Sequence, residues 1–263
     1  MTLPLIIAAA QTVPIRGDVE ANLAEHMRLA EAAADGGAQL VVFPELSLTG
    51  YELDLARELA FSEGDSRLAP LVDVAAGRRV TLVVGAPVAL GGRLHIGAVI
   101  LGADGATDIY TKRRLGAFGA EVNPGGAVPP AEARVFEPGE RDPLLGIGDH
   151  RAAIAICADT GDAAHPAAAA RRGADLYLAS MFIIPGDYEA ETGALAGYAR
   201  GHGMAVVMAN YGGPTGGLAA AGGSGIWAPG GERLGRLAAA GAGLAIAGWV
   251  DGVWRGRAAL LDG

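Results

Sequence analysis

Short apolar runs, bounded by glycine, proline or charged residues, recur along the whole chain and constrain its fold more than any other feature. Between several of these runs, apolar residues return at three- and four-residue spacing, as they do on one face of a helix. Runs that are apolar on both faces suit the strands of a sheet covered by helices. The expected strands are Leu5–Ala10, Gln39–Phe43, Thr81–Ala86, Asp175–Ala179 and Met204–Asn210.

The helices expected between these strands have recognisable ends. The first begins after Asp18–Asn22, whose side chains can cap it, and ends at the glycine pair Gly36-Gly37. The others are predicted over Asp65–Gly77, Ala167–Arg172 and Asp187–Gly201. Strands that alternate with helices in this way predict an α/β fold.

Two parts of the chain depart from this alternation and predict antiparallel pairing. Leu94–Leu101 and Thr107–Thr111 flank a turn and predict a hairpin, so the sheet is expected to be mixed. The glycine-rich segments Gly225–Ala228 and Gly243–Val250 predict antiparallel strands that close the sheet. Because no linker or change of composition divides the chain, we expect one domain, residues 1–263, with two layered sheets.

The composition excludes several classes of protein. The chain has 263 residues, of which 51% are hydrophobic, so it can bury a large core. A net charge of -9 with scattered Lys and Arg argues against nucleic acid as a partner. The apolar runs are too short for a membrane span, and Met1–Gln11 lacks the basic start of a signal peptide. One cysteine excludes an internal disulfide and a multi-thiolate metal site, which fits a cytoplasmic location.

Three reactive side chains stand at the ends of expected strands. Cys157, the one cysteine, ends an apolar run and is followed at once by a turn-prone segment, which places its thiol at the lip of a sheet. Glu45 follows the strand Gln39–Phe43 and reaches the same kind of rim, and Lys112 follows the hairpin. The competing interpretations are a buried structural cysteine for Cys157, a solvated loop charge or a helix-cap acid for Glu45, and a solvated loop charge for Lys112.

The segments around these residues, taken in order and spacing, resemble the nitrilase or carbon–nitrogen hydrolase superfamily, and its amidase-like branch in particular. The resemblance extends from Gln11 to about Leu237. The segments that carry it are Phe43–Tyr51, Tyr110–Lys112, Glu121 with Pro124–Gly126, Ile154–Asp159, Asn210 and Gly223–Gly231.

The resemblance implies a single-domain, four-layer α-β-β-α sandwich with mixed sheets and a catalytic set of Glu45, Lys112 and Cys157. Cys157 would attack an amide carbonyl as a thiolate and form a thioester, and Glu45 would accept and return the proton. Lys112 would lower the pKa of the thiol and, with the backbone N–H of Ala158, stabilise the oxyanion.

The resemblance further implies a small-molecule amide substrate, no cofactor or metal, and a homodimer or higher homo-oligomer. Glu121 matches a second glutamate that orients substrate and lysine in many amidases. The chain departs from the family at position 158, where alanine replaces the common aromatic or acidic residue, and in a longer segment from Thr160 to Pro166. Both departures fall where the substrate pocket is built, so they leave the identity of the substrate open.

Other functions compete with a small-amide amidase, either ω-amidase-like or aliphatic. The same residues could hydrolyse an N-carbamoyl group or a nitrile, or transfer the acyl group to an amine. A cysteine–histidine hydrolase could use His150, His165 or His202 as its base, although none has a papain-type context. A protein of another class would be a catalytically silent sandwich that binds or assembles with partners.

Overall fold

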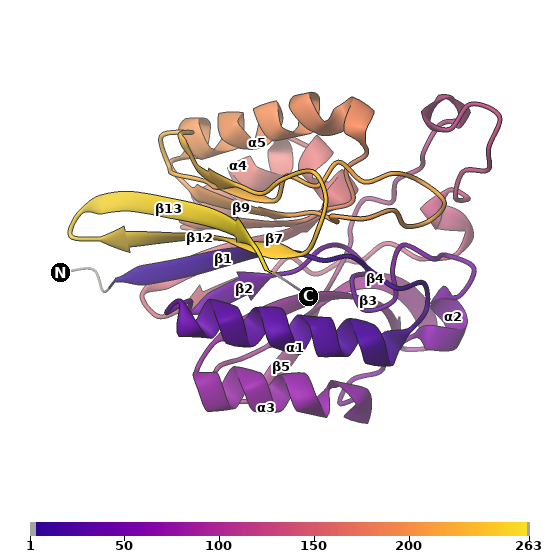
Figure 1. Cartoon of the computed structure of the whole chain (residues 1–263), viewed down its shortest axis with the longest axis horizontal. Coiled ribbons are helices and arrows are strands. Elements are labelled where there is room, and N and C mark those ends of the chain that lie inside the picture. The colour runs from indigo at the N-terminus through magenta and orange to yellow at the C-terminus, as the bar shows by residue number, and fades with distance from the viewer. Residues whose placement is uncertain (1–3, 262–263) are drawn as a thin grey trace.

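The computed structural model describes residues 4–261 and contains two β-sheets packed face to face, with helices on both outer faces (Figure 1). Met1–Leu3, part of the N-terminal segment Met1–Gln11, and residues 262–263 lie outside the described chain. The first sheet contains, in spatial order, β13 (Val253–Leu260), β12 (Gly243–Val250), β1 (Leu5–Gln11), β2 (Leu40–Val42), β3 (Thr81–Leu90), β4 (Arg93–Leu101) and β5 (Thr107–Thr111). The second contains β11 (Arg233–Arg236), β10 (Gly225–Trp227), β9 (Ala205–Ala209), β8 (Leu176–Ser180), β7 (His150–Ile156) and β6 (Leu144–Ile147).

Two helices cover each sheet, as Figure 1 shows. The first sheet carries α1 (Val19–Asp35) and α3 (Ala69–Arg78), and the second carries α4 (Ala164–Arg171) and α5 (Tyr188–His202). The short α2 (Ala56–Leu59) contacts β3. Asp18 caps α1 by accepting a hydrogen bond from Ala21 N–H, as the sequence predicted.

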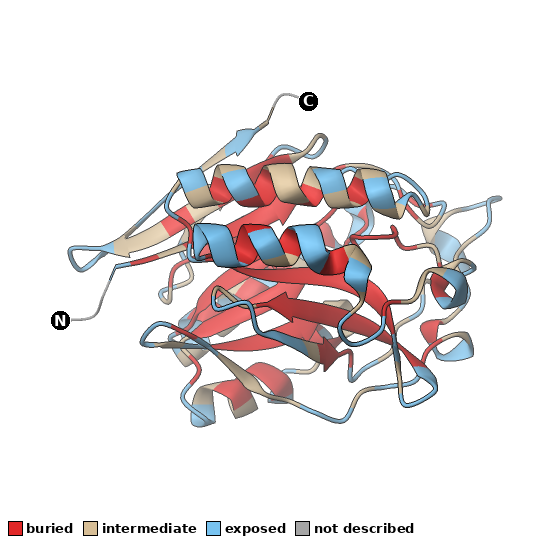
Figure 2. Cartoon of the chain, turned by 90° about the horizontal axis from the view of Figure 1, so that it is seen from below, coloured by how far each residue is buried: buried red, intermediate tan, exposed pale blue. Residues whose placement is uncertain are grey.

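Three apolar layers hold the sandwich together. The central layer lies between the sheets, and the two outer layers lie between each sheet and its helices. In Figure 2 the central strands of the sheets are buried, while the edge strand β13 is largely exposed and the helices expose one side to solvent. The strands need apolar residues on both faces for this reason, and the expected four-layer α-β-β-α sandwich is confirmed.

The pairing of strands is mixed in both sheets. β1, β2 and β3 are parallel, as are β7, β8 and β9, whereas the flanking strands pair antiparallel. The predicted β4–β5 hairpin and the closing strands near the C-terminus are confirmed. β3 runs four residues beyond the expected Ala86, to Leu90, and β6 was not predicted from the sequence. Among the described residues, no helix is both long and apolar enough to cross a membrane.

Candidate active site

Glu45 is held at the end of β2 by bonds from the other sheet. Ser180 Oγ, at the end of β8, donates to the carbonyl of Phe43 at 2.5 Å, and the Tyr211 hydroxyl donates to the carbonyl of Glu45 itself. Leu46, the next residue, has a φ of 53°, in the left-handed region, and turns the chain sharply after Glu45. The Glu45 side chain is 1% exposed, so the turn directs a carboxylate into the protein interior.

Lys112 follows β5 and lies between two carboxylates. Its Nζ donates to Glu45 Oε1 at 2.6 Å and to Glu132 Oε1 at 2.7 Å, and its side chain is fully buried. Glu132 is 1% exposed and also accepts hydrogen bonds from the Tyr51 hydroxyl and from Gly116 N–H, each at 2.7 Å. The two glutamates thus fix the position of the lysine ammonium group.

Cys157 begins the short 3-10 helix η4 (Cys157–Gly161) at the end of β7. Its φ of 42° lies in the left-handed region, where a residue other than glycine is strained by about 1 to 3 kcal/mol. The thiol donates weakly to the Phe182 carbonyl, with 3.7 Å between sulfur and oxygen. Cys157 is partly buried and directly follows β7, at the end of that strand.

Asp159 stabilises this strained turn. One of its carboxylate oxygens accepts from Tyr110 Oη at 2.7 Å and from Ile156 N–H at 3.0 Å. The other accepts from the N–H groups of Arg113 and Arg114, at 3.0 and 2.8 Å. Asp159 therefore ties the turn that carries Cys157 to the residues directly after Lys112.

Burial governs the protonation of the three central groups. It raises the pKa of Glu45 to about 7, although Lys112 acts in the opposite direction. Burial and the charge of Glu45 raise the pKa of the Cys157 thiol well above its usual value; Lys112 lowers it as expected, but is outweighed. Burial alone would lower the pKa of Lys112, yet Glu45 and the other nearby acidic groups raise it. The free site therefore holds a neutral thiol, a lysine ammonium and a base that titrates near neutrality.

Cys157 lines a cavity of about 170 Å³. Aromatic and aliphatic side chains form its walls, among them Tyr51, Phe118, Phe182 and Met181. Phe118 and Phe182 pack edge to face, with 5.3 Å between ring centroids. Glu45 lies next to this site, and its Oε2 is buried without an N–H or O–H partner among the described residues. This free oxygen is available to accept a proton.

The structure does not bring Glu121 to this site, in contrast to the sequence-based expectation. Glu121 lies in the short η2 (Ala120–Val122) on the surface, where its carboxylate packs against Gly119. The position beside Lys112 belongs to Glu132, which lies beyond a loop rich in glycine and proline. The length of such a loop cannot be read from spacing alone. The apolar Val135 and Phe136 that follow Glu132 were the available signal that this segment packs against the core.

The histidines considered as alternative bases contact other groups. His165 Nδ1 bonds the Tyr177 hydroxyl at 2.8 Å, and His150 Nδ1 lies 2.5 Å from Asp175 Oδ2. His202 stacks on Tyr198 at the end of α5. No histidine of the described chain lines the cavity at Cys157.

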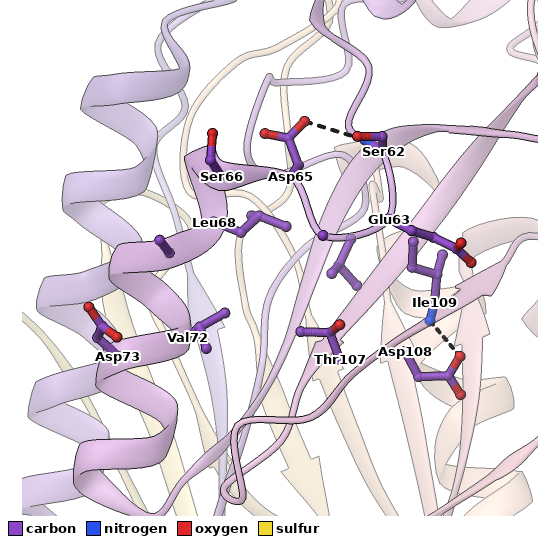
Figure 3. Close-up of a pocket in the computed structure, with 13 residues that line it drawn as sticks. Ser62, Glu63, Asp65, Ser66, Leu68, Val72, Asp73, Thr107, Asp108 and Ile109 are labelled. Carbon is purple, nitrogen blue, oxygen red and sulfur yellow. Dashed lines mark hydrogen bonds between the residues drawn. The ribbon is translucent and has the colours of Figure 1, made fainter.

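A separate cavity of about 490 Å³ lies between the start of α3 and strand β5 (Figure 3). Carboxylates line it, including Asp65, which accepts from Ser62 N–H as drawn in Figure 3 and pairs with Arg67 at 2.7 Å. None of Glu45, Lys112 and Cys157 lines this cavity.

The sandwich fold, with a buried glutamate–lysine pair next to a cysteine, is the architecture expected of a nitrilase-superfamily hydrolase. The chain belongs to the carbon–nitrogen hydrolase family, whose model matches residues 6–251.

Solved structures of similar fold include a nitrilase-superfamily amidase from Nesterenkonia sp. AN1. That structure is 30% identical, has a TM-score of 0.80, and the match covers 94% of this chain and 91% of the other. The same amidase in complex with butyramide gives a TM-score of 0.77 at 29% identity, covering 92% and 89% of the two chains.

The curated relatives are longer proteins. The glutamine-dependent NAD(+) synthetase of Thermotoga maritima is 29% identical over 176 residues, which are 66% of this chain but 29% of that protein. The Mycobacterium tuberculosis protein of the same name is 35% identical over 101 residues, 38% of this chain and 15% of the relative. The matched region therefore spans less than a third of the length of these relatives.

Proposed function

We propose that this protein is an amidase that hydrolyses small amides through a thioester on Cys157. The observation that carries the proposal is the buried arrangement in which Lys112 Nζ bridges Glu45 and Glu132, at 2.6 and 2.7 Å, beside a cysteine at the base of a small cavity. A nucleophile, a base and a fixed cation are the groups that amide hydrolysis requires.

In the first half of the reaction, Glu45 takes the thiol proton and Cys157 Sγ forms a bond with the amide carbonyl carbon. The raised pKa of the thiol means that a base must remove this proton during attack, because little thiolate exists beforehand. The tetrahedral intermediate then collapses: the carbon–nitrogen bond breaks, and Glu45 returns the proton to the departing ammonia. A thioester remains on Cys157.

In the second half, Glu45 removes a proton from water, which attacks the thioester carbon. The carbon–sulfur bond breaks, the carboxylic acid leaves, and the proton returns to the sulfur. The unpaired Oε2 of Glu45 suits both proton transfers, since its Oε1 is engaged by Lys112.

Two donors would stabilise the oxyanion in each half of the reaction. Lys112 supplies a fixed charge, and Ala158 N–H, in the first turn of η4, belongs to the N–H groups that have no acceptor within their helix. A donor of this kind contributes roughly 3 to 4 kcal/mol to transition-state stabilisation. Glu132 acts as a positioning residue, because it holds Lys112.

The substrate class is inferred from the size and walls of the cavity. About 170 Å³ lined by Phe118, Phe182 and Met181 suits a short aliphatic acyl group. Structures of the Nesterenkonia amidase carry butyramide or the product of acrylamide addition at the active-site cysteine, which supports a short amide here. The likeness to glutamine-dependent NAD(+) synthetases makes glutamine a second candidate substrate.

The test is ammonia release from a panel of aliphatic amides, glutamine, ω-amido acids, N-carbamoyl amino acids and nitriles. We expect the wild type to hydrolyse short amides and Cys157→Ala to lose roughly 10⁴-fold or more in kcat. Because Cys157 is the one cysteine, intact mass during turnover should show a single acyl adduct that the variant lacks. The absence of both turnover and adduct, with folded protein, would favour the silent-sandwich alternative.

A further inference from the structure

The mouth of the active-site cavity carries negative charge that no lining cation balances. Asp187 and Glu191 line it, and no lysine or arginine of the described chain does. Lys112 is fully buried, does not line the cavity, and is already bound by Glu45 and Glu132. The cavity that holds the nucleophile thus presents to an entering substrate two carboxylates that no lysine or arginine pairs, although Glu191 has a hydrogen-bond partner in Thr160.

Neither carboxylate is neutralised by its surroundings. In the described chain, neither Asp187 nor Glu191 takes part in a salt bridge. Arg114, from the loop next to the cavity, pairs with Asp162 at 3.1 Å instead. Glu191 is half-buried, and burial together with Asp187 raises its pKa, as expected for a carboxylate whose charge lacks a cation.

Helix stabilisation accounts for only part of this arrangement. Asp187 and Glu191 lie at the start of α5, where acidic side chains interact favourably with the helix dipole. Glu189, in the same first turn, is exposed and supplies such an interaction without lining the cavity. Asp187 makes no capping hydrogen bond with its side chain. Interaction with the helix dipole therefore accounts for acidic residues at the start of α5, but it does not account for the position of Asp187 and Glu191 at the cavity.

We propose that the cavity selects amides with a positively charged group, such as an ammonium, at the end remote from the scissile bond. Asp187 and Glu191 are the specificity-determining residues, and they face this cation while Phe118 and Phe182 contact the methylene chain between charge and amide. A substrate carboxylate at that end meets two like charges and is disfavoured, which argues against ω-amido acids. This inference rests on the proposed amidase function.

The test uses three series of unbranched amides with three to five methylene groups, ending in a methyl, an ammonium or a carboxylate group. We expect kcat/KM at low salt to follow the order ammonium, methyl, carboxylate, with a ratio of about tenfold between ammonium and carboxylate. In the double variant Asp187→Asn/Glu191→Gln, this ratio should fall toward one. Because the ratio is taken within one protein preparation, it does not depend on the fraction of active enzyme.

Glu189→Gln is the matched control for Glu191→Gln, since each removes one negative charge from the first turn of α5 and only Glu191 lines the cavity. Glu189→Gln should retain the wild-type ratio. If the double variant folds poorly, the single variant Glu191→Gln takes its place, and its ratio should lie between that of the wild type and one. Hydrolysis of methyl-ended amides combined with an equal or higher rate for carboxylate-ended amides would overturn the inference, as would an undiminished wild-type ratio in the double variant. Failure to hydrolyse any amide of the three series would instead overturn the proposed function.

Discussion

The central residues of the site are buried, and their negative charges outnumber their positive charge. Glu45 and Glu132 share one ammonium, that of Lys112, and the Cys157 thiol beside them is neutral. An excess of negative charge disfavours a preformed thiolate and keeps the base partly protonated near neutral pH. The reactivity of Cys157 therefore depends on the protonation state of Glu45.

Glu132→Gln tests this dependence. In the wild type, kcat/KM should rise with pH through about 7, because Glu45 must lose its proton before it can act as base. Since the charge of Glu132 raises the pKa of Glu45, its removal should shift the acidic limb of the profile to lower pH. The variant should also lose roughly 10²-fold in kcat, because Lys112 is held by one carboxylate fewer. The measurement is kcat/KM for a short amide across pH.

Glu121→Gln is the control for the same measurement. Its carboxylate lies on the surface against Gly119, so both kcat and the pH profile should match the wild type. A loss of activity in Glu121→Gln with an unchanged Glu132→Gln would contradict the assignment of the lysine-holding role to Glu132.

Glu121 and Glu132 show which site residues could and could not be predicted from the sequence. Lys112 and Cys157 each follow a predicted strand directly, Glu45 follows one after a single proline, and the register of a strand fixes where the next residues lie. Glu132 follows an irregular loop, residues 113–131, whose path depends on contacts such as that of Gly116 N–H with Glu132 itself. No local pattern encodes such a path.

Among the elements, the turn after β2 depends on an unusually close approach by β3. A Cβ added at Gly85 would lie 2.1 Å from the carbonyl oxygen of Pro44 and 2.4 Å from the amide nitrogen of Leu46. Gly85 also bonds this turn through its own backbone, accepting from Leu48 N–H at 2.9 Å. The position of Glu45 therefore requires a residue without a side chain on the neighbouring strand.

Gly85→Ala should displace this turn and Glu45 with it. We expect a loss of about 1 to 3 kcal/mol in the free energy of unfolding, as for overpacking of a core, and a fall in kcat that exceeds the loss of folded protein. Gly77→Ala is the control, because a Cβ there has no atom within 4 Å and α3 should be unchanged or stabilised. Thermal unfolding and kcat of both variants provide the measurement. Equal behaviour of the two variants would show that β3 does not constrain the turn.

Helices and strands were predicted correctly where the hydrophobic periodicity was strong and the segments that pack together are close in sequence. The β4–β5 hairpin and helices α1 and α5 were found because their signals are local. β6 was missed because its four residues carry little periodicity and gain their strand geometry from pairing with β7. Parallel pairing between distant strands likewise follows from packing of the whole domain.

In the whole molecule, the site lies where the two sheets meet. Glu45 and Lys112 come from the ends of β2 and β5 in the first sheet, and Cys157 from the end of β7 in the second. Tyr211 and Ser180 join the second sheet to the turn that carries Glu45. Catalytic geometry is therefore a property of the docked sandwich, and it forms only when the central apolar layer does.

The charge of the whole protein should add to the selection made at the cavity mouth. A net charge of -9 attracts cations over distances of about 10 Å at 0.1 M salt and about 30 Å at 0.01 M. For an ammonium-ended amide we expect kcat/KM to fall about threefold to tenfold between 0.01 and 0.3 M NaCl, since salt screens this attraction. A carboxylate-ended amide should show the opposite trend, and kcat should change little for either.

The methyl-ended amide of the same length separates screening from an effect of salt on the protein. Its kcat/KM should stay constant, because it carries no charge to be screened. The double variant Asp187→Asn/Glu191→Gln should retain a weaker salt dependence, since most of the protein's negative charge lies elsewhere. If the methyl-ended amide followed the ammonium-ended one, salt would be acting on the fold or the catalytic groups. If the salt dependence vanished in the double variant, the two carboxylates alone would account for the attraction.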